Sequence, residues 1–251
     1  METGAELQRA GGRHAAALRP ITIEPQVNMY AEGSALISYG RTLVLCTATV
    51  EDTIPDFCRE TGEGWVTAEF GMLPRATSQR VKRRGANTPP DGRALEIQRL
   101  IGRSLRAVVN RKALGARTVI LDCDVLQADG GTRTAAISGS SVALWLALHQ
   151  LVQDNQILVH PMAAQVAAVS VGLYQNNPIL DPDYAEDSNL SIDLTVVMNE
   201  RSQLLEIQGA AEGAAFDRDR LNNMLDLAEQ GIPAVFAAQR QALAELTSPR
   251  A

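Results

Sequence analysis

The first half of the chain alternates strand-like and helix-like runs of apolar residues. Residues 34–52 contain two apolar stretches around a Tyr-Gly-Arg turn, which predicts a pair of strands, and residues 65–74 predict another. Apolar positions recur every three or four residues from residue 94 to residue 109, the spacing of an amphipathic helix. An apolar strand over 116–127 and a helix over 132–152, rich in Ala, Leu and Ser, complete this half.

The second half repeats the succession of strands and helices. A strand pattern begins again over 162–174, and the segments 189–199 and 203–211 predict a hairpin that turns near residues 199–202. Two helices are expected to close the chain, over 218–230 and 235–246. Strands followed by helices, twice over, predict an α+β or α/β fold with two similar halves.

Length, charge and cysteine content narrow the class of protein. The 251 residues suffice for a large core, and the net charge of −6 excludes an overall basic surface, so a polyanion site requires local clustering of cations. Cys46, Cys58 and Cys123 include no C-x-x-C pair, which argues against a disulfide framework and a zinc site and favours a reducing cytoplasm. We see no signal peptide and no apolar run near the roughly 18 residues of a membrane span.

The stretch QADGGTRTAAISG, residues 127–139, passes from a strand through two glycines into a helix. Backbone N–H groups and the positive end of the helix dipole at such a turn form an anion site. Thr132 can cap the helix, and Arg133 adds donors that match phosphate oxygens. Arg93 also follows a Pro/Gly turn at a helix start. The alternative is that both are ordinary turns with solvated arginines.

Five acidic residues within 13 positions suit a hard cation such as Mg²⁺: Asp181, Asp183, Glu186, Asp187 and Asp193. Six residues of extended strand between Asp187 and Asp193 would span about 20 Å, too far for one ion. Asp187 must therefore lie on a turn before the strand if both bind the same metal. An acidic solvated loop is the alternative, although Asp193 interrupts an otherwise apolar strand.

A run of cations without any acidic residue lies between Phe70 and Pro90, and it comprises Arg75, Arg80, Lys82, Arg83 and Arg84. This loop can neutralise phosphates of a nucleic acid. Aromatic residues make up only 4% of the chain, so contacts to the charge or shape of a nucleic-acid backbone are favoured over base stacking. A solvated loop without a ligand is the alternative.

Five stretches together resemble the bacterial RNase PH family of phosphate-dependent tRNA nucleotidyltransferases. They are LRPI at 18–21, GWVTAEFGMLPRAT at 64–77, GRALEIQRLIGRSLRAV at 92–108, LDCDVLQADGGTRTAAISG at 121–139 and EDSNLSIDLTVVM at 186–198. The resemblance extends from about residue 18 to residue 230 in the order of the family. The usual D-G-R near the start of the family is GGR here, at 11–13.

The resemblance implies an α+β RNase PH fold, like domain 2 of ribosomal protein S5, in a single domain over 1–251 with halves at about 18–152 and 162–246. It also assigns the site residues. Phosphate would bind to Arg93, Gly131, Thr132 and Arg133. Catalysis and Mg²⁺ binding would fall to Asp187 and Asp193, and tRNA binding to Arg75, Arg80 and Arg83.

The implied activity is phosphorolytic 3′–5′ trimming of nucleotides downstream of the tRNA 3′ CCA end. It would release nucleoside diphosphates reversibly, in a cytoplasmic homohexamer built as a trimer of dimers. Partners would be tRNA precursors and other RNA 3′ ends, including those of rRNA, and neither DNA nor a membrane. Two other classes of protein are also considered. One is a hydrolytic metal-dependent exoribonuclease, which would not need the two arginines at helix starts. The other is a non-catalytic exosome-like ring subunit, which would not need both aspartates.

Overall fold

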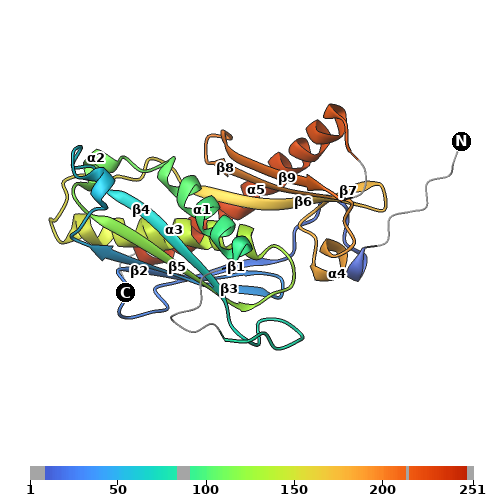
Figure 1. Cartoon of the computed structure of the whole chain (residues 1–251), viewed down its shortest axis with the longest axis horizontal. Helices are drawn as coiled ribbons and strands as arrows, with labels where there is room; N and C mark the ends of the chain where they lie inside the picture. The colour runs from blue at the N-terminus through green and yellow to red at the C-terminus, as the bar shows by residue number, and fades with distance from the viewer. Residues whose placement is uncertain (1–8, 84–90, 213–214, 248–251) are drawn as a thin grey trace, which may run out of the picture.

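A five-stranded sheet forms the first half of the protein (Figure 1). The computed structural model describes residues 9–83, 91–212 and 215–247. The strand order is β1-β2-β3-β5-β4, antiparallel except for the parallel pair β4–β5. The strands are β1 (Ile21–Pro25), β2 (Gly33–Tyr39), β3 (Thr42–Glu51), β4 (Trp65–Met72) and β5 (Thr118–Gln127). The predicted strand pair around Tyr-Gly-Arg is therefore confirmed as β2–β3.

Alternation of apolar and polar residues explains why one face of this sheet is buried. Val44, Cys46 and Ala48 on β3 point into the core, as do Val119 and Leu121 on β5. The buried face packs under α1 (Gly92–Arg106) and α3 (Thr132–Gln153). Three short helical segments lie in the connections: η1 (Ala10–Gly12), η2 (Asp56–Cys58) and α2 (Arg111–Leu114). All three cysteines are buried and none forms a disulfide.

The second half is a four-stranded antiparallel sheet in the order β7-β6-β8-β9. Its strands are β6 (Val166–Tyr174), β7 (Asn177–Leu180), β8 (Ile192–Asn199) and β9 (Leu204–Ala211). The predicted hairpin is confirmed as β8–β9. The short helix α4 (Tyr184–Asp187) precedes β8, and the long helix α5 (Arg218–Thr247) packs on β6, β7 and β1. The two sheets and five helices confirm the predicted α+β fold.

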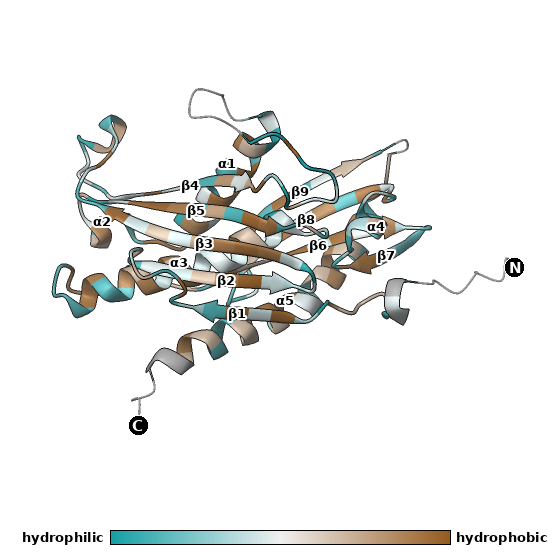
Figure 2. Ribbon diagram, turned by 90° about the horizontal axis from the view of Figure 1, so that it is seen from below, coloured by the Kyte–Doolittle hydropathy of each residue, from teal (hydrophilic) through white to brown (hydrophobic). Residues whose placement is uncertain are grey.

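Helix α3 connects the two halves through the core. It packs on β2 and β3 of the first sheet and on β6 of the second. By length and composition it is apolar enough to cross a membrane, but 78% of its most apolar window is buried inside the protein. Such a helix, apolar all round, is typical of a protein core. Figure 2 shows the apolar residues of β3 and β5 in the same central layer.

Helix α5 corrects one prediction, because the two expected C-terminal helices are a single helix that runs through Pro233. A proline inside a helix costs about 3 kcal/mol, whereas each large apolar side chain that is fully buried contributes about 1.5–3 kcal/mol. Burial therefore outweighs the break. The buried stripe continues across the proline and comprises Met224, Leu227, Ala228, Ile232, Val235 and Phe236.

Candidate active site

A glycine turn feeds the N-terminus of α3. Gly130 and Gly131 have φ values of +76° and +66°, a conformation that other residues rarely adopt. A Cβ atom at Gly130 would overlap the carbonyl oxygen of Pro182, so this turn lies directly against the second half. The N-cap residue is Gly131, and Thr132 is the first helical residue. The suggestion that Thr132 caps the helix is therefore wrong, and its backbone N–H is one of the first-turn amides that lack an acceptor within the helix.

The two predicted phosphate-binding arginines begin two different helices. Arg133 is the second residue of α3, and its side chain is 20% exposed. Arg93 is the second residue of α1 and is exposed to solvent. The side chain of Asp91 caps α1 by accepting a hydrogen bond from Ala94 N at 2.7 Å, which fixes the start of that helix.

Asp187 and Asp193 lie on opposite sides of the turn that is predicted between them. Asp187 is the last residue of α4, and Asp193 is the second residue of β8. Asp193 pairs with Gly172 of β6 across the sheet, and its Oδ1 accepts a hydrogen bond from the hydroxyl of Ser170 at 3.1 Å. Asp187 thus lies before the strand, as expected, but as the last residue of a short helix, and residues 188–189 form the turn.

The charges of the predicted site residues influence the pKa of Asp187. Burial raises the pKa of Asp187, and the negative charge of Asp193 raises it further. The positive charges of Arg93 and Arg133 act in the opposite direction on this same carboxyl. The charges that act on Asp187 thus come from segments that are distant in sequence, near residues 93, 133 and 193, and Arg19 adds to them.

The two carboxylates are suited to a hydrated Mg²⁺ ion. Mg²⁺ is commonly bound through one or two carboxylates together with substrate phosphates, and it keeps several waters. The repulsion that raises the pKa of Asp187 is the kind that a bound cation relieves. Among the described residues, no group of three or more His, Cys, Asp or Glu side chains could hold a metal. The role of Asp187 and Asp193 as a metal site remains a prediction.

The rest of the acidic cluster has another role, because arginines hold Asp181 and Glu186. Arg9 donates two hydrogen bonds to Glu186, at 2.8 and 2.9 Å, and Arg13 donates one at 2.7 Å. Arg19 donates to Asp181 at 2.6 and 2.9 Å. The acidic cluster as a whole suits a hard cation by its composition, but these two members are paired with arginines instead. We call these three arginines and two acids the buried ion cluster.

The buried ion cluster contacts both the glycine turn and the helix that ends at Asp187. Arg19 also donates to the backbone carbonyls of Asp129 and Gly130 in the glycine turn. Glu186 immediately precedes Asp187 and closes a capping box with Asp183 in α4. Burial disfavours the charge of Glu186, but the hydrogen bonds and charges of Arg9 and Arg13 outweigh burial and lower its pKa. The glycine turn and the acidic helix are thus held by one network.

Sequence reasoning did not identify the roles of Arg9, Arg13 and Arg19. Arg19 lies in the LRPI motif, and Arg13 lies in the GGR triplet that departs from the family pattern. The only available signal was chemical: arginines in apolar surroundings require acidic partners, and an acidic cluster with too many members for one metal offers them.

The cationic loop leaves the first sheet beside the glycine turn. The backbone N–H of Ala128, two residues before Gly130, donates to the carbonyl of Ala76 at 2.8 Å. Arg75, Arg80 and Arg83 are exposed, and Arg75 donates to the carbonyl of Ser78 at 3.1 Å. Arg84 and the remainder of the predicted loop up to residue 90 lie outside the described residues. The described part projects from the end of the sheet in Figure 1.

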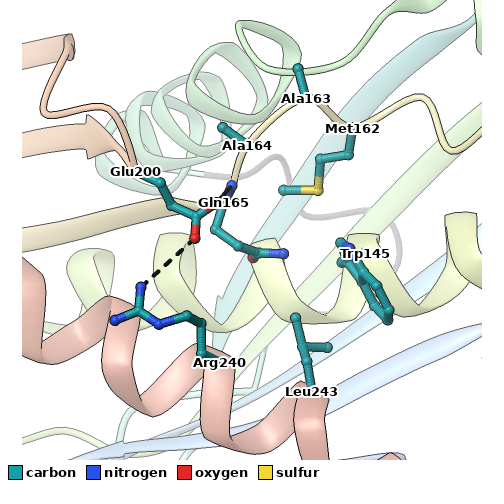
Figure 3. A pocket seen from close by; sticks show the side chains of 8 residues that line it. All are labelled: Trp145, Met162, Ala163, Ala164, Gln165, Glu200, Arg240 and Leu243. Carbon is teal, nitrogen blue, oxygen red and sulfur yellow. Dashed lines mark hydrogen bonds and ion pairs between the residues drawn. The ribbon is translucent and has the colours of Figure 1, made fainter. Parts of the chain in front are cut away.

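A cavity of about 340 Å³ lies elsewhere, between α3, α5 and the segment before β6 (Figure 3). Trp145, Met162 and Leu243 contribute to its lining, and Glu200 and Arg240 form an ion pair at 3.8 Å across it. None of the predicted site residues lines this cavity. Glu200 follows the end of β8, seven residues or about 23 Å of strand from Asp193, so the cavity is separate from the candidate site.

Comparison with solved structures shows the same fold in proteins of low sequence identity. The structure of Rrp46 from rice (Oryza sativa) has a TM-score of 0.75 at 17% identity, covering 94% of this chain and 100% of that one. The Archaeoglobus fulgidus exosome with RNA bound to the active site has a TM-score of 0.77 at 21% identity, with 92% of each chain covered. An archaeal exosome core gives 0.74 at 20% identity, covering 91% and 90%.

Two family models match most of the chain, one in each half. Domain 1 of the 3′ exoribonuclease family matches residues 17–148, and domain 2 matches residues 164–231. The first match contains the arginines and the glycine turn, and the second contains both aspartates. The chain therefore belongs to the 3′ exoribonuclease family, also called the RNase PH family.

Proposed function

We propose that the protein is a phosphorolytic 3′–5′ exoribonuclease of the bacterial RNase PH type, which trims nucleotides downstream of the tRNA 3′ CCA end. The observation that carries the proposal is that the glycine turn, with Arg133 just behind it at the start of α3, lies directly against the segment that leads into Asp187. The positive charges of Arg93 and Arg133 act on that carboxyl. An attacking water molecule has no need of two arginines and a helix N-terminus. Inorganic phosphate, an anion, fits them.

In this proposal Arg93, Arg133 and the amides around Gly131 and Thr132 bind and orient hydrogen phosphate. One phosphate oxygen attacks the phosphorus of the last phosphodiester. The bond from that phosphorus to the preceding 3′ oxygen breaks, and this oxygen takes the proton that the attacking phosphate carried. The product is a nucleoside diphosphate. The anhydride bond of the nucleoside diphosphate is close in energy to the phosphodiester bond that is broken. An excess of nucleoside diphosphate should therefore drive the reverse reaction.

Asp187 and Asp193 would hold Mg²⁺, which when bound neutralises negative charge on the transferred phosphoryl group. The arginines provide positioning and charge stabilisation, which supply most of the rate in phosphoryl transfer. We further propose a cytoplasmic homohexamer, a trimer of dimers, that acts on tRNA precursors and other RNA 3′ ends and on neither DNA nor membranes. Assembly is supported by the exosome particles in which the structural neighbours occur.

The proposal predicts that trimming requires phosphate. A tRNA with extra 3′ nucleotides, incubated with Mg²⁺, should be shortened to the CCA end only when inorganic phosphate is added. Chromatography of the products should identify nucleoside diphosphates. Monophosphates formed without phosphate would instead establish a hydrolytic enzyme, and tight RNA binding without any cleavage would establish a non-catalytic ring subunit.

The cationic loop predicts a salt-dependent contribution to tRNA binding. Changing Arg75, Arg80 and Arg83 together to Ala should weaken tRNA binding and reduce the slope of log K against log salt by about one unit per lost phosphate contact. A very short oligonucleotide, which does not reach the loop, should be trimmed almost as before.

The matched control changes Arg201, Arg218 and Arg220 to Ala. These three arginines are also exposed, so the control removes the same net charge from other surfaces. Equal losses of affinity in both triple variants would show that net charge, rather than this loop, binds tRNA.

A further inference from the structure

A polar bridge joins Arg133 to two elements behind it. Nη1 of Arg133 donates to Oε1 of Gln208 on β9 at 3.2 Å, and Nε2 of Gln208 donates to Oε1 of Glu96 on α1. The same Glu96 oxygen lies 3.8 Å from Nη1 of Arg133. We call Glu96, Gln208 and Arg133 the amide bridge. It connects α1, α3 and β9 next to the candidate phosphate site.

Glu96 determines which way the Gln208 amide points. An amide has an oxygen that accepts and a nitrogen that donates, and the two ends are similar in size. An ionised carboxylate only accepts, so Glu96 requires the NH₂ group of Gln208. The amide oxygen is then directed to Arg133, whose guanidinium only donates. If Glu96 were absent, the amide could turn its NH₂ group toward Arg133 and no longer hold it.

The amide bridge contacts Nη1 of the Arg133 guanidinium. Both of its contacts fall on Nη1, which leaves the donors of Nε and Nη2 directed elsewhere in the planar group. A long side chain that is already held loses less conformational freedom when it binds a ligand. Glu96 also lies one helical turn after Arg93, so the bridge links Arg133 to the helix that carries the other predicted phosphate-binding arginine.

We propose that Gln208 is a positioning residue for Arg133, and that Glu96 sets the orientation of its amide so that Arg133 presents its donors to inorganic phosphate. This rests on the proposed function, in which Arg133 binds phosphate. The bridge lowers the phosphate concentration required for activity, because Arg133 is oriented before phosphate arrives.

A second contact between α1 and β9 provides a matched control. Arg103 on α1 forms an ion pair with Glu206 on β9, two residues before Gln208. This pair links the same two elements but does not contact Arg133. Gln208→Ala and Glu206→Gln therefore both loosen the α1–β9 contact, whereas only the first releases the arginine.

The experiment measures the initial rate of trimming against phosphate concentration at saturating RNA. We expect Gln208→Ala to raise the KM for phosphate roughly tenfold, as expected for loss of a hydrogen bond to a charged group. The kcat and the KM for RNA should change much less, and Glu206→Gln should match the parent.

An exchange of the two side chains tests the direction of the bridge. Gln208→Glu alone places two carboxylates face to face and should also raise the KM for phosphate. Combining it with Glu96→Gln should restore the KM. In the double variant the carboxylate at position 208 would accept from Arg133 and from the amide at position 96, so both hydrogen bonds are kept while the one between positions 96 and 208 reverses its direction.

A second readout separates this inference from the proposed function. Phosphate binding without RNA is measured by the rise in Tm that phosphate produces. Stabilisation without turnover in the parent would overturn the proposed function, while the Tm shifts of the variants would still test the bridge. An unchanged KM and Tm shift in Gln208→Ala, an equal change in Glu206→Gln, or a parent that phosphate does not stabilise would each overturn the inference.

Discussion

Replacing Asp193 by Asn is expected to reduce phosphate-dependent trimming by about a thousandfold, the upper range for loss of one preorganised electrostatic group. Asn keeps the size of the side chain and can still accept the hydrogen bond from Ser170. It removes the charge that would hold Mg²⁺ with Asp187. The cationic loop is unaffected, so tRNA affinity should remain at the parent value.

Single-turnover rates at saturating phosphate, together with tRNA binding by filter retention, test this expectation. Asp226→Asn, on the exposed surface of α5, is the control for loss of one acidic charge. If Asp193→Asn trims RNA at the parent rate in Mg²⁺, then Asp193 has only a structural role. If both activity and tRNA binding disappear, the substitution has disturbed more than the metal site.

The largest effect on stability is expected from Glu186→Gln. Glu186 is 2% exposed, and Arg9, at 5%, depends on it as a partner. Breaking a buried ion pair by removing one partner costs about 3–5 kcal/mol, because the other charge stays buried without compensation. The matched control is Glu206→Gln, whose partner Arg103 is largely exposed, and such surface pairs contribute only about 0–1 kcal/mol. Urea unfolding at pH 7 measures both values.

The destabilisation by Glu186→Gln should depend on pH. The pKa of Glu186 is lower in the folded protein than its ordinary value of 4.5, so its contribution to the free energy of unfolding is fully present above that value. The contribution is lost as the pH falls through the folded-state pKa. The parent and the variant should therefore converge in stability in acid. A constant difference between pH 7 and pH 3 would show that the charge of Glu186 is not what stabilises the cluster.

Local patterns in the sequence predicted the elements of the site but not their partners. The spacing of Asp187 and Asp193 was sufficient to place a turn between them, because strand geometry fixes the distance along the chain. By contrast, Arg19 and Asp181 are 162 positions apart, and Arg133 and Gln208 are 75 apart. No periodicity reports such contacts, so the arginine partners of Asp181 and Glu186 could not be predicted.

Two local errors have the same physical origin. The local pattern predicts two helices, over 218–230 and 235–246, whereas the apolar stripe that continues past Pro233 packs on distant strands and a single helix forms. Threonine is a common capping residue, which suggests Thr132 as the helix cap, whereas the close contact with Pro182 requires Gly130 and the N-cap falls on Gly131. At both positions, packing against distant parts of the chain determines which of two locally acceptable conformations forms.

The division of opposite charges between the two halves has a consequence for the order in which the protein is made. The arginines and the cationic loop precede residue 134, and the candidate carboxylates begin at residue 187. A nascent chain therefore carries the cations proposed to bind RNA well before the groups proposed for catalysis. The glycine turn also lacks Asp181, which orders it through Arg19, until β7 has emerged. Chains that terminate early would be able to attract RNA but would have no complete site with which to shorten it.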